Sequence, residues 1–145
     1  MRKLRVLFVC TGNRARSQMA EGFLRYCAGD RFDAYSAGTK PKGLSSITVE
    51  VMRELGIDVS EHRSKSVEEF VSEDFDYVIT VCDVARAACP KFDRSKYQLH
   101  WSVTDPAELE ATGVVSIEAF RAARDELRVR IEEFMRERMP GTATK

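Results

Sequence analysis

The chain has 145 residues, of which 43% are hydrophobic and 32% are charged. This length fits one domain, and the composition can build a core, which argues against an intrinsically disordered protein. The 23 basic and 23 acidic residues give a formal charge of zero, so we expect neither nucleic acid nor a membrane as a partner.

The first ten residues, MRKLRVLFVC, begin basic and turn apolar, as a signal peptide does. The apolar run is too short for a signal peptide or a membrane span, and a Gly/Asn/Arg turn follows it instead of a small-residue cleavage site. We therefore predict a cytoplasmic protein whose four cysteines are mostly reduced. No two cysteines have C-x-x-C spacing and the chain has only two histidines, so we predict no metal site.

Short apolar runs alternate with helical patterns along the chain. The sequence predicts strands at 4–9, 34–36, 77–81 and 97–101, and helices at 17–28, 46–55, 67–71, 85–88 and 116–138. In the first helix Cys27 falls on the apolar face, and we expect a packed core thiol without a redox role. His62 and His100 have no partner evident in the sequence, and we expect structural or surface roles for them.

This alternation predicts an α/β protein, with a parallel sheet between two layers of helices. Right-handed crossovers bring the carboxyl ends of the strands to one edge, where ligands bind in such folds. Cys10 and Cys82 each follow a predicted strand, so both thiols should lie at that edge. We expect a single domain over residues 1–139 and a frayed tail over residues 140–145.

The turn after the first strand reads C-x5-R, from Cys10 to Arg16, and Ser17 follows it. A tight strand-to-helix turn points its backbone N–H groups inward, and the start of the helix adds positive potential, which suits a tetrahedral oxyanion. Gly12 lets the backbone curl closely, Asn13 can brace the loop, and Arg16 can bind two anion oxygens. We expect the same field, with a hydrogen bond from Ser17, to lower the pKa of Cys10 and activate it as a nucleophile.

An arbitrary C-x5-R match is more often a buried strand cysteine beside a surface arginine. Here the strand end, the glycine, the following serine and the amphipathic helix favour an oxyanion site. The phosphate loop G-x-x-x-x-G-K-[ST] is absent from the sequence, which argues against an NTPase.

The segment CTGNRARSQMAEG, at 10–22, resembles the active-site loop of the low-molecular-weight tyrosine phosphatase fold, and in particular of the thioredoxin-coupled arsenate reductases built on it. The resemblance extends through YSAGT at 35–39, VITVCDVARAACP at 78–90 and HWSVTDPA at 100–107. It implies the strand order 2-1-3-4, a three-layer α/β/α domain with four strands, and an oxyanion loop made of Thr11, Gly12, Asn13, Arg14, Ala15, Arg16 and Ser17.

The resemblance also implies a thiol relay that serves arsenic detoxification. Cys10 attacks arsenate held by Arg16, and Asp105 protonates the departing oxygen. Cys82 then attacks the Cys10 adduct, arsenite leaves and a Cys10–Cys82 disulfide forms. Cys89 attacks Cys82, and reduced thioredoxin, as electron donor, reduces the resulting Cys82–Cys89 disulfide. We expect a monomer with no bound cofactor.

The residues alone leave alternatives open. The pair Asp105-Pro106 is also a common turn element, and Cys82 and Cys89 could be one buried and one incidental cysteine. A phosphatase of this fold shares the loop, but it usually has an aromatic residue at the position of Ala107; weak phosphatase activity is still expected. A non-catalytic oxyanion-binding or redox-sensing module, or coupling to glutaredoxin or a small thiol, are further alternatives.

Some relatives bind potassium beside the loop through oxygen ligands, partly from a segment that here reads Arg63-Ser64-Lys65. Two cationic residues in this segment argue against the metal ion. We expect the Lys65 ammonium to fill the space instead and to brace Asn13 or Glu21.

Overall fold

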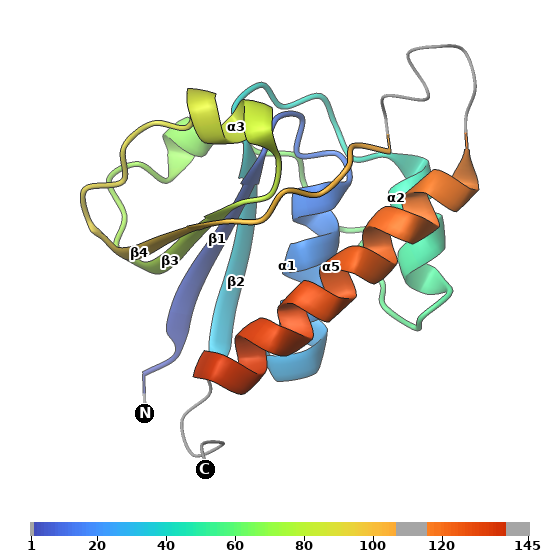
Figure 1. Cartoon of the computed structure of the whole chain (residues 1–145), viewed down its shortest axis with the longest axis horizontal. Coiled ribbons are helices and arrows are strands. Elements are labelled where there is room, and N and C mark those ends of the chain that lie inside the picture. Colours follow the sequence, from blue (N-terminus) through green and yellow to red (C-terminus); the bar gives the residue numbers. More distant parts are fainter. Residues whose placement is uncertain (1, 107–115, 139–145) are drawn as a thin grey trace.

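The computed structural model describes residues 2–106 and 116–138. Within them, one parallel sheet contains β1 (Leu4–Cys10), β2 (Phe32–Gly38), β3 (Phe75–Thr80) and β4 (Ser95–His100). The helices are α1 (Arg16–Ala28), α2 (Ser46–Arg53), the short 3-10 helix η1 (Val67–Glu69), α3 (Asp83–Ala88) and α5 (Ile117–Arg138). The strand order β2-β1-β3-β4 confirms the predicted order (Figure 1). The predicted tail at 140–145 lies outside the described residues.

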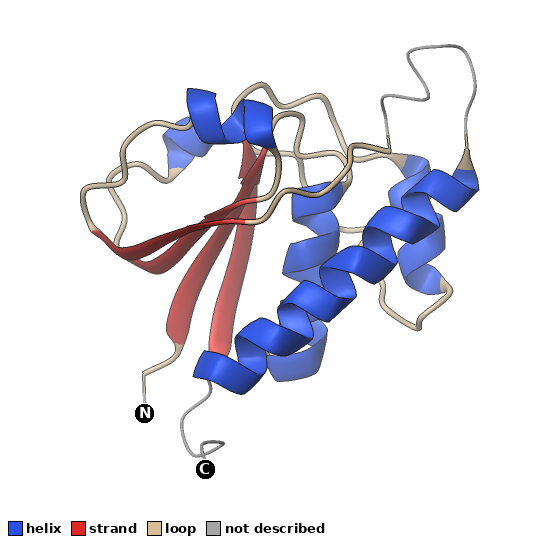
Figure 2. Ribbon diagram, viewed as in Figure 1, coloured by secondary structure: helices blue, strands red, loops and turns tan. Residues whose placement is uncertain are grey.

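Both faces of the sheet are covered, which confirms the predicted layers (Figure 2). Helices α1 and α5 pack together on one face, where the Phe134 ring contacts the rings of Phe32 and Tyr77 at centroid distances of 5.6 and 5.0 Å. Successive strand residues point to opposite faces, so Tyr35 faces away from Phe32. On that second face the Tyr35 ring contacts Phe70, which ends η1.

The predicted elements differ from the observed ones mainly in length. Strand β2 spans Phe32–Gly38 rather than 34–36, because it pairs with β1 along the whole length of both strands. The short helix predicted at 85–88 begins earlier, at Asp83, directly after Cys82. The predicted helix at 116–138 is confirmed as α5.

The expectation that Cys27 is a packed core thiol is wrong, because the residue is exposed. Helix α1 is buried on nearly all sides from Arg16 to Leu24, but its last turn emerges from the core and Ala28 is the residue buried there. Partial burial, and then the nearby Glu132 of α5, raise the pKa of the Cys27 thiol. The thiol therefore lies beside the charged flank of α5 rather than its apolar stripe.

The carboxyl ends of the strands meet at one edge of the sheet, where α3 and the turn after β1 also lie (Figure 1). Cys10 is the last residue of β1, and Cys82 follows β3 as the N-cap of α3. The two thiols therefore lie at the predicted edge. Within residues 2–106 and 116–138 the structure contains no helix long and apolar enough to cross a membrane.

Candidate active site

Cys10 lies at the bottom of the turn that joins β1 to α1, and it is 2% exposed. Its sulfur lies 2.8 Å from the hydroxyl oxygen of Ser17, and the backbone N–H of Asn13 donates to it at 3.2 Å. Asn13 has a φ of +48°, a left-handed conformation that asparagine tolerates better than most residues. This conformation aims a backbone N–H group at the sulfur.

The side chain of Asn13 holds the turn in place. Its Nδ2 donates to the Ser17 hydroxyl at 2.7 Å, and its Oδ1 accepts from the Lys65 backbone N–H at 2.8 Å and from Gln18 Nε2 at 3.0 Å. Because Asn13 occupies an acceptor position of the Ser17 oxygen, the hydroxyl proton of Ser17 can point at the sulfur of Cys10. The amide thus orients the hydroxyl toward the thiol.

The pKa of Cys10 does not follow the expectation from the sequence. Burial raises the pKa of this thiol, and that effect outweighs the Ser17 hydrogen bond, the charge of Arg16 and the Asn13 N–H, all of which lower it. The predicted lowering is therefore wrong for this arrangement. The sequence indicated the donors and the cation, but it could not indicate how completely the fold removes the sulfur from water.

Arg16, at the start of α1, connects the turn to the loop after β4. Its Nη2 lies 3.2 Å from the Asp105 carboxylate, and its Nη1 donates to the carbonyl oxygen of Val103 at 2.9 Å. The Arg16 side chain is 8% exposed and that of Asp105 is 32% exposed. The fold therefore places the partly exposed carboxyl group of Asp105 beside the turn, and its role as the acid stays a prediction from the resemblance.

A cleft of about 520 Å³ opens at this edge of the sheet. Thr11 and Arg16 line one part of it, residues 82–84 another, and residues 102–105 complete it. The Thr11 hydroxyl lies 3.5 Å from the sulfur of Cys82. The second thiol therefore borders the same cleft as the oxyanion turn.

Cys82 and Cys89 cap the two ends of α3. The sulfur of Cys82 accepts from the backbone N–H of Ala85 at 3.4 Å, and Cys89 is the C-cap. Cys89 is half-buried, and burial raises the pKa of its thiol to about 11. At about 1.5 Å of rise per residue the helix keeps the two Cα atoms roughly 10 Å apart, whereas a disulfide needs about 4.4–6.8 Å. The third thiol is therefore held away from the second.

The rest of the turn is fixed by neighbouring segments. The carbonyl oxygen of Arg14 accepts from the Thr48 hydroxyl at 2.9 Å and from the Ser45 backbone N–H at 3.2 Å, both at the start of α2. Ala15 is buried just before α1. The predicted loop residues, Thr11, Gly12, Asn13, Arg14, Ala15, Arg16 and Ser17, thus form one continuous, supported turn.

Sequence reasoning missed the importance of Gly38, at the end of β2. A Cβ atom there would lie 2.5 Å from the carbonyl oxygen of Thr11 and 2.9 Å from the backbone nitrogen of Asn13. At Gly12, which we expected to allow the close approach, the nearest atom would be in the flexible Arg14 side chain, at 3.1 Å. The turn therefore packs on the backbone of Gly38, and the YSAGT segment was the signal for it.

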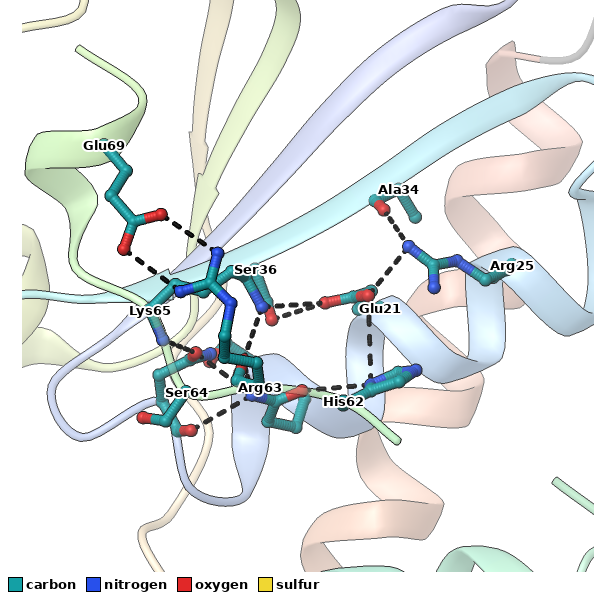
Figure 3. Close-up of polar contacts among 12 residues, drawn as sticks. Glu21, Arg25, Ala34, Ser36, His62, Arg63, Ser64, Lys65 and Glu69 are labelled. Carbon is teal, nitrogen blue, oxygen red and sulfur yellow. Dashed lines mark hydrogen bonds and ion pairs between the residues drawn. The ribbon is translucent and has the colours of Figure 1, made fainter. Parts of the chain in front are cut away.

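A polar network around the buried Glu21 lies beside the turn (Figure 3). The Ser36 hydroxyl donates to Glu21 Oε1 at 2.5 Å, and the Lys65 ammonium lies 3.8 Å from the same oxygen. That ammonium also donates to the carbonyl oxygen of Arg63 at 2.6 Å. The ammonium of Lys65 thus pairs with Glu21, one of the two partners that we expected for it, whereas Asn13 is held by the backbone N–H of Lys65 instead.

His62 belongs to the same network and has a structural position, as predicted. Its Nδ1 lies 3.0 Å from the amide oxygen of Gln18, and Gln18 in turn donates to Asn13. Burial lowers the pKa of His62 and that of Lys65. No group of three or more His, Cys, Asp or Glu side chains in the described part of the chain is placed to hold a metal ion.

Comparisons with known proteins agree with this architecture. The chain is 40% identical over 134 residues to an arsenate reductase of Halalkalibacterium halodurans, and this alignment covers 92% of this chain and 96% of the relative. It is 37% identical over 129 residues to an arsenate reductase of Bacillus subtilis, and this alignment covers 89% of this chain and 93% of the relative.

Comparison with solved structures finds arsenate reductases and a phosphatase of the same fold. An arsenate reductase in the phosphate binding state has a TM-score of 0.80 and 30% identity, with 92% of this chain and 98% of that one covered. A low molecular weight protein tyrosine phosphatase from T. tengcongensis has a TM-score of 0.72 and 30% identity, with 93% and 99% covered. Residues 5–140 match the model of the low molecular weight phosphotyrosine protein phosphatase family, and the chain belongs to this family.

Proposed function

We propose that this protein reduces arsenate to arsenite through a relay of three cysteines. The main observation that supports this proposal is that Cys82 borders the same cleft as Arg16 and Asp105. This cleft lies at the edge of the sheet where Cys10 ends β1. A phosphatase needs one thiol and water, whereas a reductase needs two electrons, which paired thiols supply. The relatives described as arsenate reductases, at 35–40% identity, support the same activity.

In the first two steps, Cys10 and Cys82 convert arsenic from the pentavalent to the trivalent state. The thiolate of Cys10 attacks arsenic, one arsenic–oxygen bond breaks, and the oxygen leaves as water with a proton from Asp105. The thiolate of Cys82 then attacks the sulfur of Cys10. The sulfur–arsenic bond breaks, its electron pair stays on arsenic, and arsenite leaves as the Cys10–Cys82 disulfide forms.

The third step transfers the disulfide to Cys89 and requires α3 to open. Cys89 attacks Cys82 and releases the thiolate of Cys10, but the intact helix holds the two cysteines too far apart. Of the six helical residues, only Ala85 is buried, and a helix this short has little stability of its own. Opening would also expose Cys89 to water and so remove the burial that raises its pKa.

We propose that reduced thioredoxin then reduces the Cys82–Cys89 disulfide, that the protein acts as a monomer, and that it works in the cytoplasm. Three residues next to Cys89, Arg86, Ala87 and Ala88, are exposed, which supports access by a protein reductant. A glutaredoxin or a small thiol is the alternative donor. We also expect weak phosphatase activity, because the turn cannot readily distinguish two tetrahedral oxyanions.

A coupled assay tests the proposal. Arsenate, thioredoxin, thioredoxin reductase and NADPH are supplied, and NADPH loss is followed with the wild type, Cys82→Ser and Cys89→Ser. Cys27→Ser is the matched control, because Cys27 is an exposed cysteine outside the cleft. We expect loss of NADPH with the wild type and the control only. Undiminished NADPH loss without Cys82 or Cys89, or cleavage of an aryl phosphate with no NADPH loss in the wild type, would contradict the proposal.

A further inference from the structure

A hydrogen bond between His100 and Asp83 connects α3 to the end of the sheet. His100 Nε2 lies 2.7 Å from the carboxylate of Asp83, the first residue of α3. A carboxylate can only accept hydrogen bonds, so Nε2 carries a hydrogen, and the Nδ1 atom of the ring lies 2.7 Å from the Thr80 hydroxyl. The Ser102 hydroxyl donates to the other oxygen of Asp83 at 3.4 Å.

The two partners of this pair differ in how firmly they are held. His100 is the last residue of β4, is paired with Thr80 of β3, and has a side chain that is 17% exposed. The Asp83 side chain is 76% exposed. His100 is therefore the fixed partner, and Asp83 is the partner that moves when α3 opens.

The other attachments of α3 are modest. Ala85 is the buried residue of this helix, and the Cys82 sulfur caps it through a long bond of 3.4 Å. The backbone N–H of Arg86 donates to the carbonyl oxygen of Cys82 at 3.0 Å. A charge-assisted hydrogen bond of 2.7 Å at the first helical residue is therefore a substantial part of what holds α3 in place.

We propose that Asp83 and His100 are positioning residues that hold α3 closed and so set how readily Cys89 reaches Cys82. The inference rests on the proposed relay and deepens it. Forming the Cys82–Cys89 disulfide removes two electrons and two protons from the thiols and opens the helix. The hydrogen bond between His100 and Asp83 stabilises the dithiol form, so breaking it favours the disulfide and makes the reduction potential of this couple more negative.

Amide hydrogen exchange in the reduced full-length protein tests, without any catalytic turnover, whether Asp83 and His100 hold α3 closed. We expect the amides of Ala85 and Arg86 to exchange about fivefold faster in Asp83→Ala and in His100→Ala, and no faster still in the double variant. Asp93→Ala, at an exposed aspartate outside α3, should leave these amides unchanged. Unchanged exchange in His100→Ala, or additive effects in the double variant, would overturn the proposal, since Asp83 would then act on the helix alone.

The reduction potential of the Cys82–Cys89 couple is a second measurement. A purely structural role of Asp83 and His100 would not change it. In a Cys10→Ser/Cys27→Ser background, the Cys82–Cys89 pair is equilibrated with oxidised and reduced dithiothreitol, which exchanges the two electrons and two protons. A fivefold change corresponds to about 20 mV for two electrons, and we expect Asp83→Ala and His100→Ala each to make the potential more negative by about this amount. An unchanged reduction potential in both variants would overturn the proposal that Asp83 and His100 hold α3 closed. Failure of the proposed function would give a different result. Arsenate turnover would then leave no disulfide between Cys82 and Cys89, whatever the amide exchange rates of α3 are.

Discussion

The sulfur of Cys10 and the hydroxyl oxygen of Ser17 lie 2.8 Å apart at the bottom of the turn after β1. Asn13 donates to the same hydroxyl at 2.7 Å, which directs the Ser17 proton toward the sulfur. In a site where burial raises the pKa of the thiol, this hydrogen bond is one of the interactions that stabilise the thiolate. The pair therefore contributes to how much of Cys10, the nucleophile of the proposed relay, is ionised at neutral pH.

Removing the hydroxyl should make Cys10 less reactive. In Ser17→Ala the pKa of Cys10 should rise further, because a hydrogen bond to the thiolate is lost, so alkylation at pH 7 should slow about tenfold. The measurement is the pH dependence of iodoacetamide labelling, followed by peptide mapping that separates Cys10 from the exposed Cys27. Ser17→Thr keeps a hydroxyl and serves as the control. Equal apparent pKa values for the wild type and Ser17→Ala would refute this role.

The glycine under the turn should be far less tolerant of substitution than the glycine within it. In Gly38→Ala the new Cβ would meet two backbone atoms, at 2.5 and 2.9 Å, which should cost about 3 kcal/mol and lower Tm by about 10 °C. In Gly12→Ala the nearest contact is the Arg14 side chain, which can move, so Tm should change little. Calorimetry on both variants checks this, and similar Tm losses would show that Gly38 has no special role.

Stability should depend on pH through Glu54, which joins the end of α2 to α5. Hydrogen bonds from Arg121, at 2.6 Å, and Arg124, at 2.7 Å, hold the pKa of Glu54 at about 2, below its usual value. A carboxyl with a depressed pKa stabilises the fold fully above its unfolded pKa, near 4.5, and this contribution is lost as pH falls toward 2.

Urea unfolding of Glu54→Gln between pH 6 and pH 3 should therefore show a deficit relative to the wild type that shrinks as pH falls. Glu50→Gln, at an exposed glutamate of the same helix, is the matched control and should show little deficit. A deficit that stays constant over this range would mean that the charge of Glu54 contributes nothing.

Potassium should give the protein no particular advantage. The Lys65 ammonium already lies against Glu21 and the carbonyl oxygen of Arg63 (Figure 3). Activity and Tm should therefore be the same in potassium and sodium chloride at equal ionic strength, and Lys65→Met should lower Tm while Lys3→Met, at an exposed lysine, should not. A clear gain in potassium over sodium with the wild type would show that a metal ion, not Lys65, supports the turn.

Much of the fold could be predicted because its signals are local. The apolar runs of β1 and β3 are buried almost throughout, and such runs between turn signals indicate strands of a covered parallel sheet. The apolar stripe of α5 has the helical spacing, and Phe120, Leu127 and Phe134 are indeed buried. Because two cysteines directly follow predicted strands, their place at the carboxyl edge of the sheet could be predicted as well.

What could not be predicted depends on contacts between distant residues. Asp83 and His100 are 17 residues apart and meet only because β3 and β4 pair side by side. Cys27 differs from Ala28 by one position on the helix, and the packing of α1 against the sheet and α5 decides which of them is buried. The raised pKa of Cys10 likewise reflects complete burial, which no local pattern reports.

The most direct test of the account is to map disulfides after one turnover. Reduced protein is mixed with arsenate in the absence of any reductant. The remaining free thiols are then alkylated rapidly at mildly acidic pH, where disulfide exchange is slow, and the protein is digested for mass spectrometry. The account predicts one arsenite released per chain and a bridge that joins Cys82 to Cys89, with Cys10 and Cys27 alkylated. Arsenite released while Cys89 is still a free thiol would contradict it, because the oxidation would then have stopped at a Cys10–Cys82 bridge or left by another route.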